Sequence, residues 1–501
     1  MSDETKREET QPRSKLPDRP VAWVLLLASG LSLALLAYAM LQENVLSQWR
    51  KVQRTYRSLL ASSTDAKQQQ LAHDFTVELR QVDLPQLDTV DRCVSCHLGF
   101  DNPAMASAEQ PFRTHPGTVL RDHPLSDYGC TICHRGQGAA TNFRDAKAVD
   151  AYWDYPLLPA KLTQSSCGLC HGTESALADE HAPELARGRR LFVDRGCQSC
   201  HKLGGQGGQL GPALDREGMK TSHVLPMAAV TGEHTVANWL GQHFDDPQQI
   251  VAGSQMPPPR LAPAENHALT IYMLSLQGRD LPQTYIARDK IAEWDQARNA
   301  RTTDAARLYE GRCKTCHGDG TYSRWNAFFN RFTPAIRGPG LRAMTDKTWL
   351  REAVAKGRPG TIMSGWEKGG GGFDEAQLVA MVDYLAEGDG RPAQSLRPTP
   401  PNLSAGHEAR GAELFTQLCS ACHGLNGSGG IAPTLNNPVF LASTSDDVIA
   451  TTIVNGRADT AMPSFQRLDA AGLSDQEVRD LVKLVRSFAA PPVAHNRKSH
   501  L

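Results

Sequence analysis

Hydrophobic positions near the N-terminus follow two different patterns. Residues 21–41 form an uncharged apolar run of 21 positions, long enough to cross a bilayer as a helix that rises about 1.5 Å per residue. After this run, apolar residues recur at steps of four, three, four and three, the spacing of one helix face: Val45, Trp49, Val52, Tyr56 and Leu59. The patterns predict a membrane-spanning helix and then a helical stalk. The apolar face of the stalk packs either on a partner membrane subunit or back on its own domain.

A third pattern occurs three times in the C-terminal part of the chain, where two amphipathic helices flank Gly- and Pro-rich loops. The opening helices lie in "ARGRRLFVDRGCQSCH", "AARLYEGRCKTCH" and "ARGAELFTQLCSACH". The closing helices lie in "ENHALTIYMLSL", "DEAQLVAMVDYL" and "SDQEVRDLVKLV", the last with a capping-box pattern at Ser474 and Glu477. The fold is therefore predicted to be mainly α, with three repeated domains.

All 12 cysteines of the chain lie in six C-x-x-C-H motifs. Two thiols three positions apart on one helical turn can each form a thioether to a haem, and the adjacent histidine can then bind its iron. A single motif would also fit a zinc knuckle or a redox dithiol, but six copies that use every cysteine predict six covalently bound haem c groups. The attachment cysteines are Cys93, Cys96, Cys130, Cys133, Cys167, Cys170, Cys197, Cys200, Cys313, Cys316, Cys419 and Cys422, and the proximal histidines are His97, His134, His171, His201, His317 and His423.

Zinc and disulfides are the other uses of such cysteines. Zinc would need four ligands, so the motifs would have to pair across the chain, and their spacing shows no such pairing. Haem attachment would consume the thiols that disulfides need. Covalent haem c attachment is extracytoplasmic in bacteria, so we expect the N-terminus in the cytoplasm, the anchor in the inner membrane and the haem domains in the periplasm. A cleaved signal peptide is the competing interpretation of the apolar run, because Ala37-Tyr38-Ala39 fits a cleavage site.

Motif spacing separates two kinds of haem region. The first three motifs follow one another every 37 residues, too close for three independent domains, so their haems are expected to pack together. The last three are separated by 116 and 106 residues, which is enough for one domain each. The predicted segments are a cytoplasmic tail (1–20), the anchor (21–41), the stalk (42–88), a compact loop-rich triheme region (89–183), a domain (184–278), a linker (279–302), a second domain (303–390), a Pro-rich linker (391–404), a third domain (405–490) and a tail (491–501).

The three C-terminal domains resemble class I cytochrome c, in which a loop methionine is the second axial ligand. The matching residues are Met256 in "GSQMPP", Met363 in "GRPGTIMSGW" and Met462 in "GRADTAMPSF". Pro212 and Pro433 match the proline that supports the proximal histidine in this family. The middle domain departs from the pattern, because Ser364 follows its methionine and "TPAIRGPGL" matches only loosely. Methionine as core filler is the alternative.

The triheme region resembles the haem-bearing part of membrane-anchored multihaem cytochromes in bacterial quinol-oxidising respiratory complexes. The resemblance rests on "DRCVSCHLGFDNP", "PFRTHPG", "DHPLSDYGCTICHRGQG" and "CGLCH". His115 and His123 each precede a proline, which favours an extended backbone that can project the ring toward a neighbouring haem. We expect these two as distal ligands, with His181 as a third candidate and His73 or Met105 as substitutes.

Axial ligation sets the expected function. Methionine opposite histidine raises a haem potential, so bis-His haems followed by His/Met haems predict electron flow from the membrane toward the C-terminus. One span cannot house the cofactors of a b-type quinol site, which indicates a quinol-oxidising or other polytopic membrane subunit as partner and a soluble cytochrome or terminal oxidoreductase as acceptor. Quinol binding by the triheme region at the membrane surface is the alternative. With 53 basic and 54 acidic residues, the charge gives no sign of nucleic-acid binding. A catalytic multihaem reductase or haem peroxidase is the alternative, and a haem-based sensor is a third.

Overall fold

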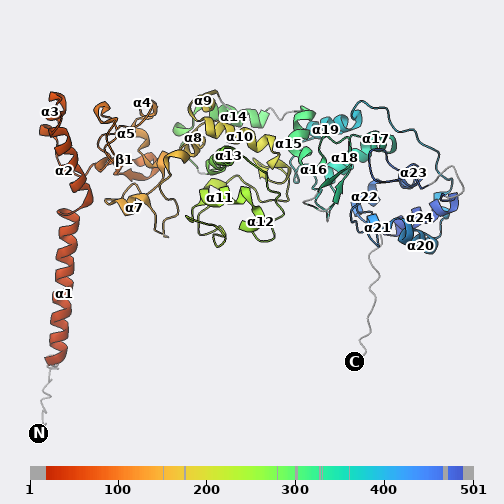
Figure 1. Ribbon diagram of the computed structural model, residues 1–501, viewed down its shortest axis with the longest axis horizontal. Helices are drawn as coiled ribbons and strands as arrows, with labels where there is room; N and C mark the ends of the chain where they lie inside the picture. Colours follow the sequence, from red (N-terminus) through yellow and green to blue (C-terminus); the bar gives the residue numbers. More distant parts are fainter. Residues whose placement is uncertain are drawn as a thin grey trace, which may run out of the picture. The chain divides into compact units, whose positions relative to one another are not determined.

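The computed structural model describes residues 19–150, 152–173, 176–278, 280–299, 303–326, 329, 331–359, 361–465 and 472–488. The predicted tail 491–501 and nearly all of the tail 1–20 lie outside these residues. The chain forms two compact units, Met1–Pro159 and Ala160–Leu501. The mainly helical prediction is confirmed: strands in the described residues form only three short two-stranded antiparallel sheets (Figure 1).

The predicted anchor forms one long helix, α1 (Arg19–Asn44), none of whose side chains is buried (Figure 1). By length and composition this helix can cross a membrane. A signal sequence near an N-terminus has the same two properties.

The stalk region forms α2 (Gln48–Ala61) and α3 (Ala66–Asp74), which fold back on the first unit. Their core joins residues from both helices to residues after the first motif: Tyr56, Leu60, Ala72, Leu98 and Met105. Of the two alternatives for the apolar face, the structure shows packing on its own domain.

The predicted apolar face of the stalk is wrong at two positions. The buried face of α2 consists of Trp49, Gln53, Tyr56 and Leu60. Val45 is exposed because it precedes the helix, and Leu59 is exposed because it lies one position, about 100°, away from the buried Leu60.

The rest of the first unit consists of short elements joined by loops. They are β1 (Val82–Leu84), η1 (Pro85–Leu87), β2 (Thr89–Asp91), η2 (Cys93–Ser95), η3 (Pro103–Met105), α4 (Val119–Asp122), α5 (Leu125–Tyr128), α6 (Thr131–His134) and α7 (Phe143–Lys147). Strands β1 and β2 pair antiparallel with Leu84 opposite Thr89, which places Asp91 at the end of the hairpin.

The second unit begins with the third motif and contains the three repeated domains. Up to residue 299 its elements are η4 (Ala160–Leu162), α8 (Gln164–Cys170), α9 (Ala176–His181), α10 (Pro183–Asp194), η5 (Cys197–Ser199), β3 (Lys202–Leu203), β4 (Gln206–Gly207), η6 (Glu217–Met219), α11 (Val236–Asp245), α12 (Pro247–Ile250), α13 (Pro263–Ser275), η7 (Gln283–Tyr285) and α14 (Arg288–Asn299). From residue 305 they are α15 (Ala305–Arg312), α16 (Lys314–His317), β5 (Arg324–Asn326), β6 (Arg331–Thr333), α17 (Pro339–Met344), α18 (Lys347–Lys356), α19 (Glu375–Glu387), η8 (Leu403–Ala405), α20 (Glu408–Leu418), α21 (Ser420–His423), α22 (Pro438–Ser443), α23 (Asp446–Asn455) and α24 (Asp475–Ser487).

Each repeated domain is closed by contact between its opening and closing helices, α10 with α13, α15 with α19 and α20 with α24. An aromatic pair marks each crossing, with ring centroids 5.4 to 5.6 Å apart: Phe192 and Tyr272, Tyr309 and Tyr384, and Phe415 and Phe488. In the first and last domains the backbones approach so closely that a Cβ on Gly188 or Gly411 would lie 2.1 or 2.2 Å from a carbonyl oxygen of the facing helix. Glycine is therefore required at these two crossings.

Both predicted linkers hold ordered contacts. Residues 279–302 include helix α14, which lies against the third motif. In residues 391–404 the Arg397 backbone N–H donates to Asn455 Oδ1 at 2.7 Å, and its guanidinium donates to the Val454 carbonyl at 2.8 Å. The Pro-rich segment thus packs along the end of α23.

Candidate haem-binding sites

All six C-x-x-C-H motifs adopt the same local geometry. In each, the backbone N–H of the histidine donates to the carbonyl of the first cysteine, at distances of 2.8 to 3.0 Å. This single helical turn brings the two cysteines and the histidine to one side of the backbone. The bonds join His97 to Cys93, His134 to Cys130, His171 to Cys167, His201 to Cys197, His317 to Cys313 and His423 to Cys419.

The last three motif histidines share a second constraint, a hydrogen bond from Nδ1 to a proline carbonyl. His201 donates to Pro212 at 2.8 Å, His317 to Pro334 at 3.1 Å and His423 to Pro433 at 2.9 Å. This bond fixes the tautomer and leaves Nε2 free to bind a metal. Pro334 lies in the loosely matching segment of the middle domain, which nevertheless holds its histidine as the other two do.

The domain at 184–278 encloses a cavity of about 310 Å³ with mainly apolar walls. Both motif thiols, His201 and Met256 lie on these walls. Burial raises the pKa of Cys197 and of Cys200 to about 12, which shows how apolar their surroundings are. An apolar cavity with two thiols, an imidazole and a thioether on its walls fits a covalently attached haem.

The methionine loops of the other two domains are built alike. Met363 and Met462 each accept a backbone N–H through their carbonyl, from Arg358 at 2.8 Å and from Arg457 at 3.1 Å. The backbone N–H of each methionine donates to a threonine hydroxyl two residues earlier at 3.1 Å. Ser364 therefore does not change how the middle domain presents Met363.

A half-buried arginine precedes each of these two loops. Burial lowers the pKa of Arg358 and of Arg457 to about 10, which still leaves both charged at neutral pH. Nε of Arg457 is buried and makes no hydrogen bond among the described residues. A guanidinium held partly out of water favours an anionic partner, and the propionate groups of a haem could supply it.

The fourth and fifth motifs lie against each other within the second unit. Ser199 Oγ donates to Thr315 Oγ1 at 3.1 Å, so the residues before the second cysteines of the two motifs are in contact. The backbone N–H of Gly207 also donates to the Gly371 carbonyl at 2.9 Å. The two attachment turns are therefore neighbours.

The third motif is cradled by α14, in a segment that the sequence indicated only as a linker. Asp289 lies 3.4 Å from His171 Nδ1 and accepts the backbone N–H of Gly172 at 3.1 Å. The backbone N–H of Thr173 donates to Glu293 at 2.5 Å. A carboxylate next to Nδ1 increases the basicity of a ligating imidazole, so Asp289 is a functional candidate that the sequence did not reveal.

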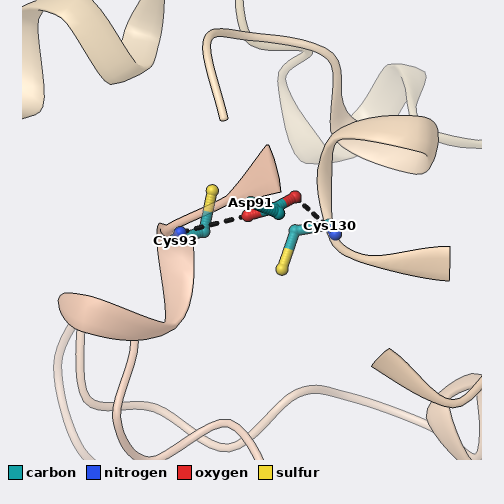
Figure 2. Close-up of side chains that lie close together, drawn as sticks. All are labelled: Asp91, Cys93 and Cys130. Atoms are coloured by element: carbon teal, nitrogen blue, oxygen red, sulfur yellow. Dashed lines mark hydrogen bonds between the residues drawn. The ribbon is translucent and has the colours of Figure 1, made fainter. Parts of the chain in front are cut away.

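The first two motifs share one buried carboxylate, that of Asp91 (Figure 2). Asp91 accepts backbone N–H bonds from Cys93 at 3.1 Å, from Cys130 at 2.7 Å and from Thr131 at 2.8 Å. Gly129 has φ of +63° and lies too close to Leu84 and Asp91 for a side chain, which explains a glycine directly before the second motif. One side chain thus joins the starts of both attachment turns.

The first cysteines of these two motifs are also close together. Their sulfurs and the Asp91 carboxylate lie within 4.8 Å of one another. The neighbouring Cys130, burial and the charge of Asp91 raise the pKa of Cys93. A zinc ion would need a fourth ligand here, whereas haem attachment would use one of these thiols for each of two haems.

His115 faces the histidine of the second motif. The ring centroids of His115 and His134 are 6.2 Å apart, and the rings are inclined by 74°. His115 Nδ1 donates to the Pro116 carbonyl at 2.9 Å, and the His115 backbone N–H donates to Phe100 at 2.9 Å. His115 and His134 could therefore hold one haem iron between them, as its distal and proximal ligands.

The structure places the other expected distal ligands as follows. His123 is half-buried, and its Nδ1 donates to the Val119 carbonyl at 3.0 Å. His181 is exposed at the end of α9, 3.7 Å from Glu180. His73 is exposed beside Asp74, and Met105 lies in the core of the first unit. Their roles as ligands stay predictions.

Two protein families match the C-terminal part of the chain. The family described as cytochrome c matches residues 185–277. The family described as cytochrome c oxidase, cbb3-type, subunit III matches residues 300–385 and 406–485. The matched segments are those with the proline-supported histidines.

Curated relatives match parts of the chain at low identity. The cbb3-type cytochrome c oxidase subunit FixP of Bradyrhizobium sp. (strain ORS 278) is 26% identical over 179 residues, covering 32% of this chain and 54% of the relative. Cytochrome c55X of Stutzerimonas stutzeri is 35% identical over 79 residues, covering 16% of this chain and 66% of the relative. The cytochrome bc1 complex cytochrome c subunit of Mycobacterium tuberculosis (strain ATCC 25618 / H37Rv) is 28% identical over 118 residues, covering 23% of this chain and 40% of the relative.

The chain thus spans between two fifths and two thirds of the length of these relatives. Cytochrome c domains carry covalently bound haem c. The family matches and the common geometry of motif, proline and methionine loop agree on the same segments. Residues 185–277, 300–385 and 406–485 are therefore cytochrome c domains, in a chain related to respiratory cytochrome c subunits.

Proposed function

We propose that the chain is a membrane-anchored hexahaem cytochrome that transfers electrons within a respiratory complex. It accepts electrons from quinol through a partner membrane subunit and delivers them to a periplasmic cytochrome or to a terminal reductase or oxidase. When bound, the haems supply reversible one-electron chemistry at iron. The observation that carries this proposal is the uniform geometry of the six motifs, together with relatives named as subunits of the cbb3-type oxidase and the bc1 complex.

The chain's own residues are proposed to hold and tune each site. The cysteines of the six motifs attach the haems, and the six motif histidines are the proximal ligands. The proposed sixth ligands of the C-terminal haems are Met256, Met363 and Met462. His115 is the proposed distal ligand of the second haem, supported by its 6.2 Å ring separation from His134. His123 and His181 are proposed as further distal ligands in the triheme region.

The proposed placement puts α1 in the inner membrane and the haem domains in the periplasm. Bis-His ligation near the anchor and His/Met ligation farther along give a rise in potential toward the C-terminus. This rise makes electron transfer away from the membrane favourable.

Membranes that contain the intact chain test this function. The chain is extracted in mild detergent, the proteins that co-purify are identified by mass spectrometry, and haem reduction is followed after adding quinol. We expect a polytopic quinol-reactive subunit in the preparation and quinol-dependent reduction that its inhibitors block. A preparation in which that subunit is present but quinol reduces none of the haems of this chain contradicts the proposal.

A further inference from the structure

The cavity of the domain at 184–278 holds a second imidazole besides that of the motif. His243, on α11, lines the same cavity as His201 and Met256. His243 belongs to no sequence motif, so no role is predicted for it from the sequence. The inference that follows rests on the proposed haem at Cys197 and Cys200.

His243 is half-buried and contacts aromatic side chains. Its ring stacks on Trp239, with centroids 4.5 Å apart and planes inclined by 12°. Its Nδ1 is shielded from solvent and makes no hydrogen bond to any described residue. A ring nitrogen that is shielded from solvent in a mainly apolar cavity without a hydrogen bond is unfavourable. A ligand in the cavity would give this imidazole a partner.

The other two cytochrome c domains show what normally occupies this position. Helices α11, α18 and α23 each begin with an N-cap side chain, of Thr235, Asp346 and Ser445, that accepts the backbone N–H three residues later. Eight residues after the N-cap, the middle and last domains place Val354 and Ile453, both buried in the core. His243 is at this position in the first of the three domains.

The backbone differs at the same place. The Val354 carbonyl accepts the N–H of Trp366, and the Ile453 carbonyl accepts the N–H of Phe465, each at 3.0 Å. Trp366 and Phe465 lie three residues after their methionines, whereas the residue three after Met256 is Pro259, which has no N–H. The N-cap is also 21 residues from Met256, against 17 from Met363 and Met462 in their domains. Met256 therefore lies on a longer loop, which lacks one backbone hydrogen bond to helix α11.

We propose that His243 is a reserve axial ligand of this haem, which takes the sixth position when Met256 leaves it. The longer methionine loop, with one backbone hydrogen bond fewer, lets Met256 move away from the iron. The imidazole of His243 then takes its place as the sixth ligand. Such a site stays six-coordinate in both states, with a lower potential when two histidines bind the iron. The other two His/Met sites have an aliphatic residue at this position and no such reserve.

Methionine variants of the intact haem-loaded chain test this inference. We compare Met256→Ala with the matched variants Met363→Ala and Met462→Ala, and with the double variant Met256→Ala/His243→Val, which carries the valine of the middle domain. The readouts are the high-spin signal of the ferric protein and carbon monoxide binding to the ferrous protein. We expect Met363→Ala, Met462→Ala and the double variant each to gain one high-spin, carbon monoxide-binding haem, and Met256→Ala to gain none.

A gain of one carbon monoxide-binding haem in Met256→Ala overturns the inference. Where an alanine variant loses its haem, Met256→Leu and Met363→Leu repeat the comparison with side-chain volume preserved. Haem mass on the Cys197–Cys200 peptide is measured in each sample. Absence of that haem in the unaltered chain refutes the proposed function, whereas its presence with carbon monoxide binding in the Met256 variants refutes only the reserve ligand.

Discussion

The pair of N-terminal motifs and the motifs of the three C-terminal cytochrome c domains are held in place by different contacts. In each C-terminal domain the motif histidine is held by a proline carbonyl of the same domain, and the opening and closing helices supply a core. In the N-terminal pair one carboxylate, that of Asp91, holds both motifs, and His115 from the loop after the first motif faces the histidine of the second. The two N-terminal motifs therefore depend on one shared side chain, while each C-terminal domain holds its motif histidine with a residue of its own.

The largest expected effect is the loss of Asp91, because it removes a contact shared by two motifs. Asp91→Ala leaves three half-buried N–H groups without their acceptor. Bonds to a charged acceptor contribute about 1.5–3 kcal/mol each, so we expect a loss of about 4.5–9 kcal/mol in the stability of the first unit. Thermal unfolding of the intact chain and haem mass on the Cys93 and Cys130 peptides measure the effect. The matched control is Asp83→Ala on the neighbouring strand, where the side chain is exposed. Unchanged melting and full haem loading in Asp91→Ala would show that the two motifs are independent.

Truncation of a core side chain in a C-terminal domain tests whether this domain can lose stability without affecting the N-terminal haems. Leu481 is only 1% exposed, within the core of the last domain. Truncation of a buried leucine to alanine costs about 2–5 kcal/mol. Leu481→Ala is expected to lower the unfolding temperature of this domain and to leave the spectra of the N-terminal haems unchanged, as followed by circular dichroism and haem absorption. Simultaneous loss of the N-terminal haem signals would contradict separate folding.

Replacement of His115 affects one haem. His115→Ala is expected to convert the second haem from low-spin to high-spin and to make it bind carbon monoxide, because the open sixth position is then accessible. Electron paramagnetic resonance of the ferric protein measures the change. His234→Ala is the control, since His234 is exposed and is not a candidate ligand. An unchanged low-spin signal in His115→Ala would rule out its ligand role.

The smallest effect concerns a carboxylate inside the last domain. Asp480 is buried; burial raises its pKa, but bonds from the His407 N–H and from Gln476 outweigh this and hold the pKa below the usual 3.8. A lowered folded-state pKa stabilises the domain above the unfolded value, and this stabilisation is lost as pH falls through the folded value. Asp480→Asn is therefore expected to cost about 1 kcal/mol at pH 7 and progressively less below pH 3.8. Urea unfolding at several pH values measures the difference, and a cost that does not change with pH would contradict the role of the charge.

Features with a local signal in the sequence could be predicted from it. The apolar run, the flanking helices and the Ser474–Glu477 capping box appear in the structure as expected. The signals are local, because helix periodicity and capping lie within a few residues of each other.

Contacts between distant segments could not be predicted. The Asp91 carboxylate accepts a hydrogen bond from a motif that begins 39 residues later. A single aspartate shortly before a cysteine does not indicate such a contact. The charged segment of α14 had helix-forming composition, but nothing in it indicated that Asp289 would lie beside His171. The position of His243, where the other two domains have an aliphatic residue, is evident only from the N-caps of helices α11, α18 and α23.

The most direct test of the central claim is a mass-spectrometric map of covalent haem on peptides from the intact chain purified from membranes. The account predicts that all six C-x-x-C-H peptides carry a haem, including the Cys93 and Cys130 peptides joined by Asp91. Haem on the Cys197, Cys313 and Cys419 peptides alone, with unmodified thiols at the first three motifs, would contradict it.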